Sequence, residues 1–253
     1  MQQSQPGAAE SIGDGRHAFT PVARAKRGYE YIAEQVRDAI ATRRYKPGDR
    51  LPTEREMAEI FEVSRNGVRE AIRSLESSGL VEIRIGVHGG VFVAAGDPQT
   101  VSRSVRDLAS LGALPPENVL EARILLTSDV LRLACERATE EDLKRIEDDI
   151  LVTEREVLQP GAQRTFQITR FYRLLAEATH NKVLVILTDS LAQAVHVRLL
   201  RGGPPVNRRV GELRRRIVGY IRAGDSESAI GEITRHLIAL EESMATAERV
   251  IGA

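Results

Sequence analysis

The residue types best suited to recognition chemistry lie close together in one short segment. Arg65, Arg69 and Arg73 recur at intervals of four residues, which places them on one face of a helix. The small polar residues at the N-terminal end of this segment are Ser64, Asn66 and Gly67. Arginine can donate two hydrogen bonds to guanine, and serine or asparagine can reach bases or phosphates. The N-terminal end of a helix in the major groove reaches the bases, so this segment predicts a recognition helix.

The opposite face of the same segment predicts the helix itself. Its apolar residues recur at helical spacing and are Val68, Ala71, Ile72 and Leu75. Ser64 can cap the N-terminal end, and Gly79 can end the helix because glycine tolerates a left-handed conformation. Glycine at position 67 would also let the helix backbone approach DNA closely.

Two more helices are expected before the recognition helix. Apolar residues recur at helical spacing from Tyr29 to Ile40, and a Lys-Pro-Gly-Asp sequence at 46–49 then breaks the chain. Thr53 and Glu56 form a capping-box pattern that opens a short second helix. Arg55 stands at the start of that helix, where it can hold a phosphate and set the register of the recognition helix.

A hairpin is expected after the third helix. Val81, Ile83 and Ile85 alternate with charged residues, which predicts a strand with one buried face. A glycine-rich turn follows, and residues 91–93 form the returning strand. Three helices and a hairpin give the order of a winged helix-turn-helix. The wing tip, from Arg84 through Gly86 to His88, is placed to lean into the minor groove.

Composition limits the alternatives. The 253 residues carry 36 basic and 36 acidic side chains, so bulk charge cannot drive nonspecific coating of nucleic acid, although a local basic face is compatible with this balance. A single cysteine excludes a disulfide framework and a cysteine-rich zinc module. No apolar run suffices to span a bilayer and no secretory signal is evident, so we expect a cytoplasmic protein. Catalytic sequence motifs are absent, which argues against an enzyme.

The organisation that follows is mostly α-helical. We expect a flexible tail at 1–23, a winged helix-turn-helix at 24–95, a linker at 96–100 and an all-helical domain at 101–250. In that last domain the expected helices lie near 101–111, 115–136, 140–158, 165–179, 183–200, 206–223 and 226–248.

The first domain resembles the DNA-binding domain of the GntR family. The resemblance covers about 28–95 and rests on the stretches Pro47 to Glu56, Val63 to Arg65, Val68 to Ala71, Leu75 to Leu80 and Gly89 to Val93. It implies operator contacts by Arg55, Arg65, Arg69 and Gly86, with Ser64, Asn66 and Gly67 at the base edges. The agreement of caps, apolar stripe and hairpin favours this interpretation over a merely solvated arginine face.

The second domain is similar to the FCD effector domain of the FadR subfamily. The similar stretches are Leu120 to Arg123, Arg137 to Leu143, Phe171 and Tyr172, Asn181, Ala223 to Asp225, and His236 and Leu237. This resemblance implies a dimer that holds a metal or an organic acid inside a helical bundle.

The chain departs from that family at the metal ligands. Many FCD domains bind a divalent cation through one aspartate and three histidines. Ile168 and Tyr172 stand at the positions of the aspartate and the first histidine, and Arg214 stands near the next histidine. Only His236 remains, and one imidazole cannot form a metal site. We therefore expect neither a metal nor a cofactor.

An arginine in place of a metal favours an anionic ligand. Arg214 can pair bidentately with a carboxylate, and Arg123 is expected to face the same cavity. Tyr172 and His236 would supply further hydrogen bonds. The alternative is that Arg214 belongs to a solvated run at 214–216 and that Tyr172 is ordinary core.

These observations predict a dimeric transcription regulator, more specifically a repressor. It would bind a palindromic operator and respond to a small carboxylate or acyl-type effector. Two alternatives stay open: a ligand-independent regulator with a degenerate pocket, and a metal-dependent sensor of the same family.

Overall fold

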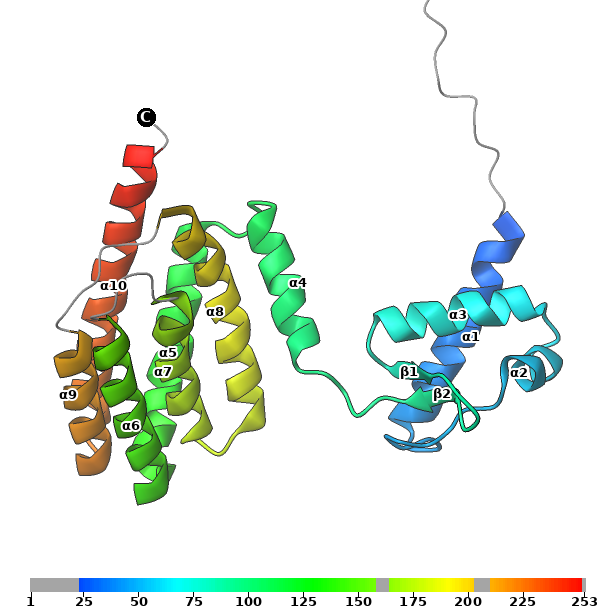
Figure 1. Cartoon of the computed structure of the whole chain (residues 1–253), viewed down its shortest axis with the longest axis horizontal. Helices are drawn as coiled ribbons and strands as arrows, with labels where there is room; N and C mark the ends of the chain where they lie inside the picture. Colours follow the sequence, from blue (N-terminus) through cyan, green and yellow to red (C-terminus); the bar gives the residue numbers. More distant parts are fainter. Residues whose placement is uncertain (1–22, 158–163, 203–209, 252–253) are drawn as a thin grey trace, which may run out of the picture. The chain divides into compact units, whose positions relative to one another are not determined.

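The computed structural model describes residues 23–157, 164–202 and 210–251 (Figure 1). The chain divides between Asp97 and Pro98 into two compact units, which we take in turn. The described residues contain no helix that is both long and apolar enough to cross a membrane.

The first unit is a winged helix-turn-helix, as the sequence predicts. Its elements are α1 (Ala23–Ala41), α2 (Glu54–Ile60), α3 (Arg65–Ser77), β1 (Val81–Arg84) and β2 (Gly90–Val93). Apolar side chains from all three helices and both strands meet in one buried core. The largest of them include Ile32, Met57, Val68, Leu75 and Val81.

The predicted helix ends are confirmed in atomic detail. Thr53 and Glu56 form the capping box of α2, since each side chain accepts a hydrogen bond from the other residue's backbone N–H. The Ser64 hydroxyl accepts from the Gly67 backbone N–H at 3.3 Å and caps α3. Gly79 follows α3 with φ of 72°, a left-handed conformation that suits glycine.

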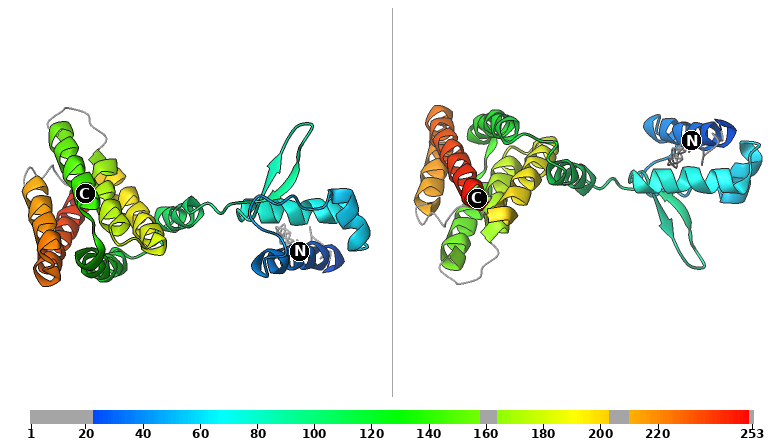
Figure 2. Two further views of the ribbon diagram at one scale, coloured as in Figure 1. Left: turned by 90° about the horizontal axis from the view of Figure 1, so that it is seen from below. Right: turned by 90° about the horizontal axis from the view of Figure 1, so that it is seen from above.

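The wing is a two-stranded hairpin that projects from the three helices of this unit (Figure 2). The strands are antiparallel, with Val81 opposite Val93 and Arg84 opposite Gly90. The other edge of β2 pairs with the extended stretch before α2, because the Leu51 backbone N–H donates to the Val91 carbonyl at 2.8 Å. The base of the wing is thus fixed on both sides.

The expected buried face of the first strand is wrong beyond its first residue. Val81 is buried, but Ile83 is 44% exposed and Ile85, which lies past the end of β1, is 99% exposed. The hairpin extends past the edge of the helical core, so nothing in this unit covers its outer half. Alternation identified the strand, but it carries no information about how far the core reaches.

The second unit contains seven helices and no strand within the part of it that the structure describes, which confirms an all-helical domain. The helices are α4 (Gln99–Ser110), α5 (Pro116–Arg137), α6 (Glu140–Val157), α7 (Arg164–Glu177), α8 (Lys182–Gly202), α9 (Val210–Ala223) and α10 (Ser226–Ile251). Because α4 begins at Gln99, the last two residues of the expected linker are helical. The expected start of the sixth helix, at 206, lies outside the described residues.

The core of this unit lies among α5, α6, α7, α9 and α10 (Figure 1). Each of these helices contributes side chains with no exposed surface, among them Leu131, Ile146, Leu175, Ile217 and Leu237. Helix α8 is tied to α10 by Arg198, which pairs with both Glu241 and Glu248.

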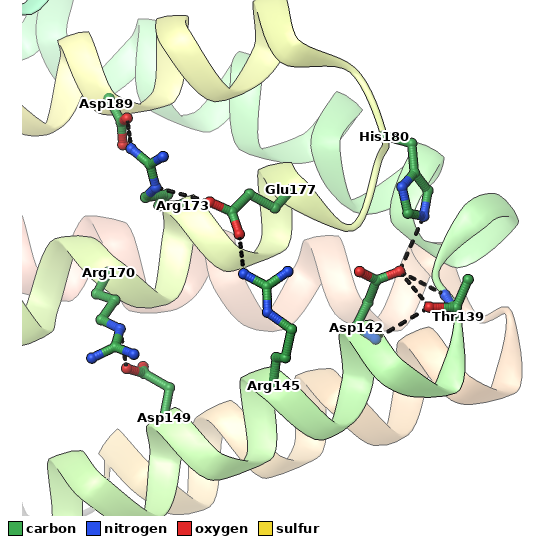
Figure 3. A network of polar contacts seen from close by, with 9 residues as sticks. All are labelled: Thr139, Asp142, Arg145, Asp149, Arg170, Arg173, Glu177, His180 and Asp189. Atoms are coloured by element: carbon green, nitrogen blue, oxygen red, sulfur yellow. Dashed lines mark hydrogen bonds and ion pairs between the residues drawn. The ribbon is translucent and has the colours of Figure 1, made fainter. Parts of the chain in front are cut away.

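Charged side chains reinforce the packing of α6, α7 and α8 (Figure 3). Arg145 of α6 donates to Glu177 of α7 at 2.5 Å. Arg173 of α7 contacts Glu177 in its own helix and Asp189 of α8. Burial raises the pKa of Asp189, and the Arg173 guanidinium opposes that shift. This chain of alternating charges ties three helices together at one side of the bundle.

The bundle core provides a direct test of this packing. We expect Leu131→Ala to lower the free energy of unfolding by about 2–5 kcal/mol, because a buried leucine loses its contacts and leaves a cavity. The control is Leu111→Ala at an exposed leucine, which should cost about 0.5 kcal/mol or less. Urea denaturation of both variants measures the difference, and equal losses would contradict the described core.

Candidate functional site

Helix α3 has two chemically distinct faces, as predicted. Val68, Ala71, Ile72 and Leu75 are buried against the unit's core. Arg65, Arg69 and Arg73 are all exposed, so the arginine face is free to meet a large partner.

Glu54 holds one of these arginines in a fixed orientation. The Nε and Nη2 atoms of Arg69 donate to the two carboxylate oxygens of Glu54 at 2.7 to 3.2 Å. The hydrogen bond from Arg69 is the main reason that the pKa of Glu54 is lowered. Because Glu54 lies in the first turn of α2, the pair ties α2 to α3. Sequence reasoning missed Glu54, since the two residues are far apart in the chain and share no helix.

Arg55 lies on the exposed surface of α2. Its guanidinium contacts Glu59 of the same helix at 3.1 Å, with both side chains largely in solvent. An exposed pair of this kind contributes little to stability, so a phosphate can compete for the guanidinium.

The N-terminal turn of α3 is open. Ser64 and Asn66 are exposed, and Gly67 is partly buried. A Cβ atom added at Gly67 would meet nothing closer than the Ser64 hydroxyl at 3.8 Å, which is ordinary contact. The fold therefore does not require glycine at this position. The missing side chain does leave the helix backbone accessible to a ligand.

The predicted wing residues Arg84, Gly86 and His88 are all exposed, but their surroundings differ. Arg84 pairs with Glu82 and lies 4.2 Å from the centre of the Phe92 ring, which holds it against the hairpin. Gly86 has φ of 120°, and His88 lies in the turn. Sequence reasoning missed Arg50, whose Nη2 donates to the Gly89 carbonyl at 2.8 Å and anchors the turn.

A second candidate site lies inside the bundle. Arg123 of α5, Tyr172 of α7 and Arg214 of α9 are all buried. The Arg123 guanidinium carbon lies 5.2 Å from the centre of the Tyr172 ring, and that of Arg214 lies 4.7 Å from the Phe171 ring. Three helices thus bring the predicted residues together.

Arg214 does not belong to a solvated run. Its side chain is 3% exposed, whereas those of its neighbours Arg215 and Arg216 are each 50% exposed. Those two pair with Glu154 and Glu232 at the surface. The alternative raised from the sequence is therefore wrong for Arg214, because α9 turns this one arginine towards the core.

Asp149 and Thr153 of α6 surround Arg214. The guanidinium donates to the Thr153 hydroxyl at 3.2 Å and lies 3.9 Å from the Asp149 carboxylate. Asp149 also contacts Arg170 at 3.1 Å (Figure 3), so two arginines share its charge. Burial lowers the pKa of Arg214, and Tyr172 and Asp149 oppose that shift. Sequence reasoning missed Asp149, although a carboxylate between Ile146 and Ile150 on an apolar helix face is a usable signal.

His236 of α10 completes the cluster. Burial, together with the positive charges of Arg214 and Arg123, lowers its pKa to about 4, while Glu232 opposes this shift. The imidazole is therefore neutral near pH 7 and can both donate and accept a hydrogen bond.

These side chains do not form a metal-ligand set. Within the described ranges, no group of three or more histidine, cysteine, aspartate or glutamate residues is arranged to hold a metal ion. The structure places Arg214 and Arg123 near His236, and Arg123 in turn lies against the Tyr172 ring. A guanidinium repels a cation, so the cluster suits an anion.

Comparisons with known proteins divide the chain in the same way. Residues 28–93 match the model of the bacterial regulatory proteins of the gntR family, and residues 118–239 match the FCD domain. The first match contains α2, α3 and the wing, and the second contains the buried cluster.

Individual relatives agree with these matches. A regulatory protein assigned to an L-lactate dehydrogenase operon in Escherichia coli (strain K12) is 30% identical over 225 residues, 84% of either chain. The Uxu operon transcriptional regulator of that strain is 38% identical over 165 residues, 64% of this chain and 63% of the regulator, so less than two thirds of its length is spanned. The structure of Streptococcus agalactiae GntR aligns with a TM-score of 0.58 at 24% identity, covering 85% of this chain and 100% of that one, which supports the fold.

The lowered pKa of His236 predicts a pH dependence of stability. Between about pH 6.5 and pH 4 the His236 imidazole is protonated in the unfolded chain but stays neutral in the folded protein. The free energy of unfolding therefore falls as the pH is lowered through this window. His236→Gln removes this term and should lose less thermal stability than the wild type between about pH 7 and pH 5. Thermal melts across that range provide the measurement, and parallel pH profiles would contradict a buried neutral histidine.

Proposed function

Because the chain belongs to the GntR family of bacterial regulatory proteins, we propose that it is a DNA-binding transcription regulator whose FCD domain senses a small organic anion. It binds a palindromic operator as a homodimer and represses transcription until the anion binds. The observation that carries the effector part of this proposal is the burial of Arg214, near the position where the resemblance to FCD domains implies a metal-binding histidine.

In the DNA-binding unit, α3 enters the major groove with its N-terminal turn foremost. Arg65 and Arg69 reach base edges, and Arg55 holds a phosphate that fixes the position of the helix. Ser64, Asn66 and Gly67 lie where the backbone comes closest to the bases. The wing residues Arg84, Gly86 and His88 face the adjacent minor groove. All of these residues except the partly buried Gly67 are exposed, which supports this arrangement.

A single recognition helix reads only a short DNA sequence, so a dimer is needed for a specific operator. Two subunits related by a two-fold axis place two copies of α3 on two half-sites of a palindrome. Contacts from exposed arginines to phosphates release counterions, so operator affinity should fall as salt is raised.

In the FCD domain, charge balance favours an anion. Arg123 is buried, with 8% of its surface exposed. It contacts the Tyr172 ring but forms no ion pair with a carboxylate of the described residues. Asp149 is shared between Arg214 and Arg170. Burial of the Arg123 guanidinium without an ion-pair partner is costly, and a ligand carboxylate that accepts two hydrogen bonds from it would relieve that cost. The hydroxyls of Tyr172 and Thr153 and the neutral His236 add partners for the polar groups of such a ligand.

The anion changes DNA affinity if it binds one conformation of the dimer more tightly than another. It can shift the arrangement of the two DNA-binding units only as far as it binds one arrangement better than the other. An anion that draws α5, α6, α9 and α10 around the buried arginines supplies such a difference.

Arg214 is tested by a volume-conserving substitution. A thermal-shift screen of L-lactate, succinate, citrate and gluconate should identify an acid that stabilises the wild type, by about 2.7 kcal/mol at a hundredfold excess over its Kd. Arg214→Met should abolish this stabilisation and the acid's effect on DNA binding, while operator affinity without acid persists. The control is Arg215→Met, at the exposed neighbour. An unchanged response in Arg214→Met, or stoichiometric zinc, nickel or manganese in the purified protein, would contradict the anion site.

Gly67 is tested by separating stability from recognition. Gly67→Ala should raise helix stability by up to about 1 kcal/mol, because alanine fits the space and favours the helix. It should also weaken binding to DNA fragments selected by the wild type, since the added methyl group meets the bases. The control is Gly28→Ala in α1, where a Cβ atom also has open space, and it should leave affinity unchanged. Equal affinities of the two variants would show that α3 does not approach DNA at Gly67.

A further inference from the structure

The tip of the wing presents two apolar side chains entirely to solvent. Ile85 and Val87 are each 99% exposed, more than any other large apolar residue in the described part of the chain. They flank Gly86 in the turn between β1 and β2, at the far end of the projecting hairpin (Figure 2). Nothing in the folding of this unit requires an apolar residue at either position.

The turn is built to hold these side chains outward. The Gly89 backbone N–H donates to the Gly86 carbonyl at 2.8 Å, which closes a tight turn with Val87 and His88 at its corner. A Cβ atom at Gly89 would lie 2.5 Å from the Arg84 carbonyl oxygen, so only glycine fits there. Gly86, with φ of 120°, adopts a conformation that other residues rarely reach.

The cationic groups of the wing are held where the two strands meet the turn. Arg84 is paired with Glu82 and stacked on Phe92, and Arg50 is bound to the Gly89 carbonyl. Residues 85–90 contain no lysine or arginine. The wing therefore carries two guanidinium groups held in place directly beside an apolar tip.

We propose that the tip, residues 85–88, is an apolar wedge that enters the minor groove beside each operator half-site and partly unstacks one base step. This inference rests on the proposed DNA binding and goes beyond it, because it adds an inserted apolar contact by Ile85 and Val87 to the contacts of the wing's polar groups. Minor-groove proteins combine cationic groups along the backbone with an inserted apolar side chain, and the wing has both components. DNA is the occupant because the wing belongs to the same compact unit as the arginine face of α3.

The wedge would make operator affinity depend on the DNA sequence that flanks each half-site, without any hydrogen bond to a base. Pyrimidine–purine steps such as TA and CA unstack more easily than other steps, so they lower the cost of insertion. The chain should therefore prefer such a step at a fixed distance outside each half-site. It should also bend the DNA there, because insertion opens the minor groove.

The experiment is a binding-site selection from random double-stranded DNA. It compares the wild type, the double variant Ile85→Ser/Val87→Ser and the control Leu111→Ser, which changes an exposed leucine of the other unit. The wild type and the control should enrich a half-site and a flanking pyrimidine–purine step. The double variant should enrich the same half-site without the step, and should bind wild-type-selected fragments about tenfold more weakly. Its melting temperature should match that of the wild type, because both side chains are solvent-exposed.

Bending is measured on one selected fragment that carries a fluorophore at each end. The wild type should shorten the end-to-end distance, and the double variant should leave the fragment nearly straight. Identical flank preferences and identical bending would overturn the wedge, and an apolar tip used to contact another protein would give that result. If the wild type enriches no sequence at all, the proposed operator binding fails as well, so the two failures are distinguishable.

Discussion

A guanidinium buried in a helical bundle is the constraint on which the second unit depends. Arg214 is almost fully removed from solvent, and such a charge must be compensated by its surroundings. The bundle supplies a hydroxyl from Thr153, the face of the Phe171 ring and part of the Asp149 charge. Burial keeps His236 neutral, and the charge of Arg214 adds to this effect. The cluster is thus one electrostatic unit whose members cannot be changed independently.

The first unit depends on a simpler division between the two faces of α3. Burial of Val68 and Leu75 fixes the rotation of the helix, and this rotation exposes the arginines. Rotation alone does not fix the position of a long side chain. The bidentate pair of Arg69 with Glu54 does so, and it also sets α3 against α2. In the proposed operator complex, recognition would therefore start from an arginine that is already ordered, and DNA would compete with Glu54 for it.

Local sequence patterns were sufficient to predict the helices and strands, but not which side chains of these elements are buried or which partners they contact. The capping box at Thr53, the cap at Ser64 and the stop at Gly79 depend on a few adjacent residues, so they were predictable. The exposure of Ile85 was not, because alternation does not say where the core ends. The burial of Arg214 could not be predicted either. A small rotation of α9 about its axis would decide which of the three consecutive arginines faces the core, and the sequence does not fix that rotation. Pairs such as Arg69 with Glu54 join separate helices and leave no local signal.

If an anion binds at the buried cluster as proposed, the neutral His236 beside two arginines would couple that binding to proton uptake. Burial lowers the pKa of His236, and the charges of Arg214 and Arg123 lower it as well. A bound carboxylate would offset their charge and would itself favour the protonated imidazole, so the pKa of His236 would rise on binding. By linkage, the complex would then take up protons at a pH where the free protein does not, and the anion would bind more tightly as the pH falls towards the raised pKa. A metal held by histidines gives the opposite dependence, because its ligands must lose protons to bind. An anion site built on Arg214 would thus reverse the sign with which acidity acts on effector binding, compared with a metal site.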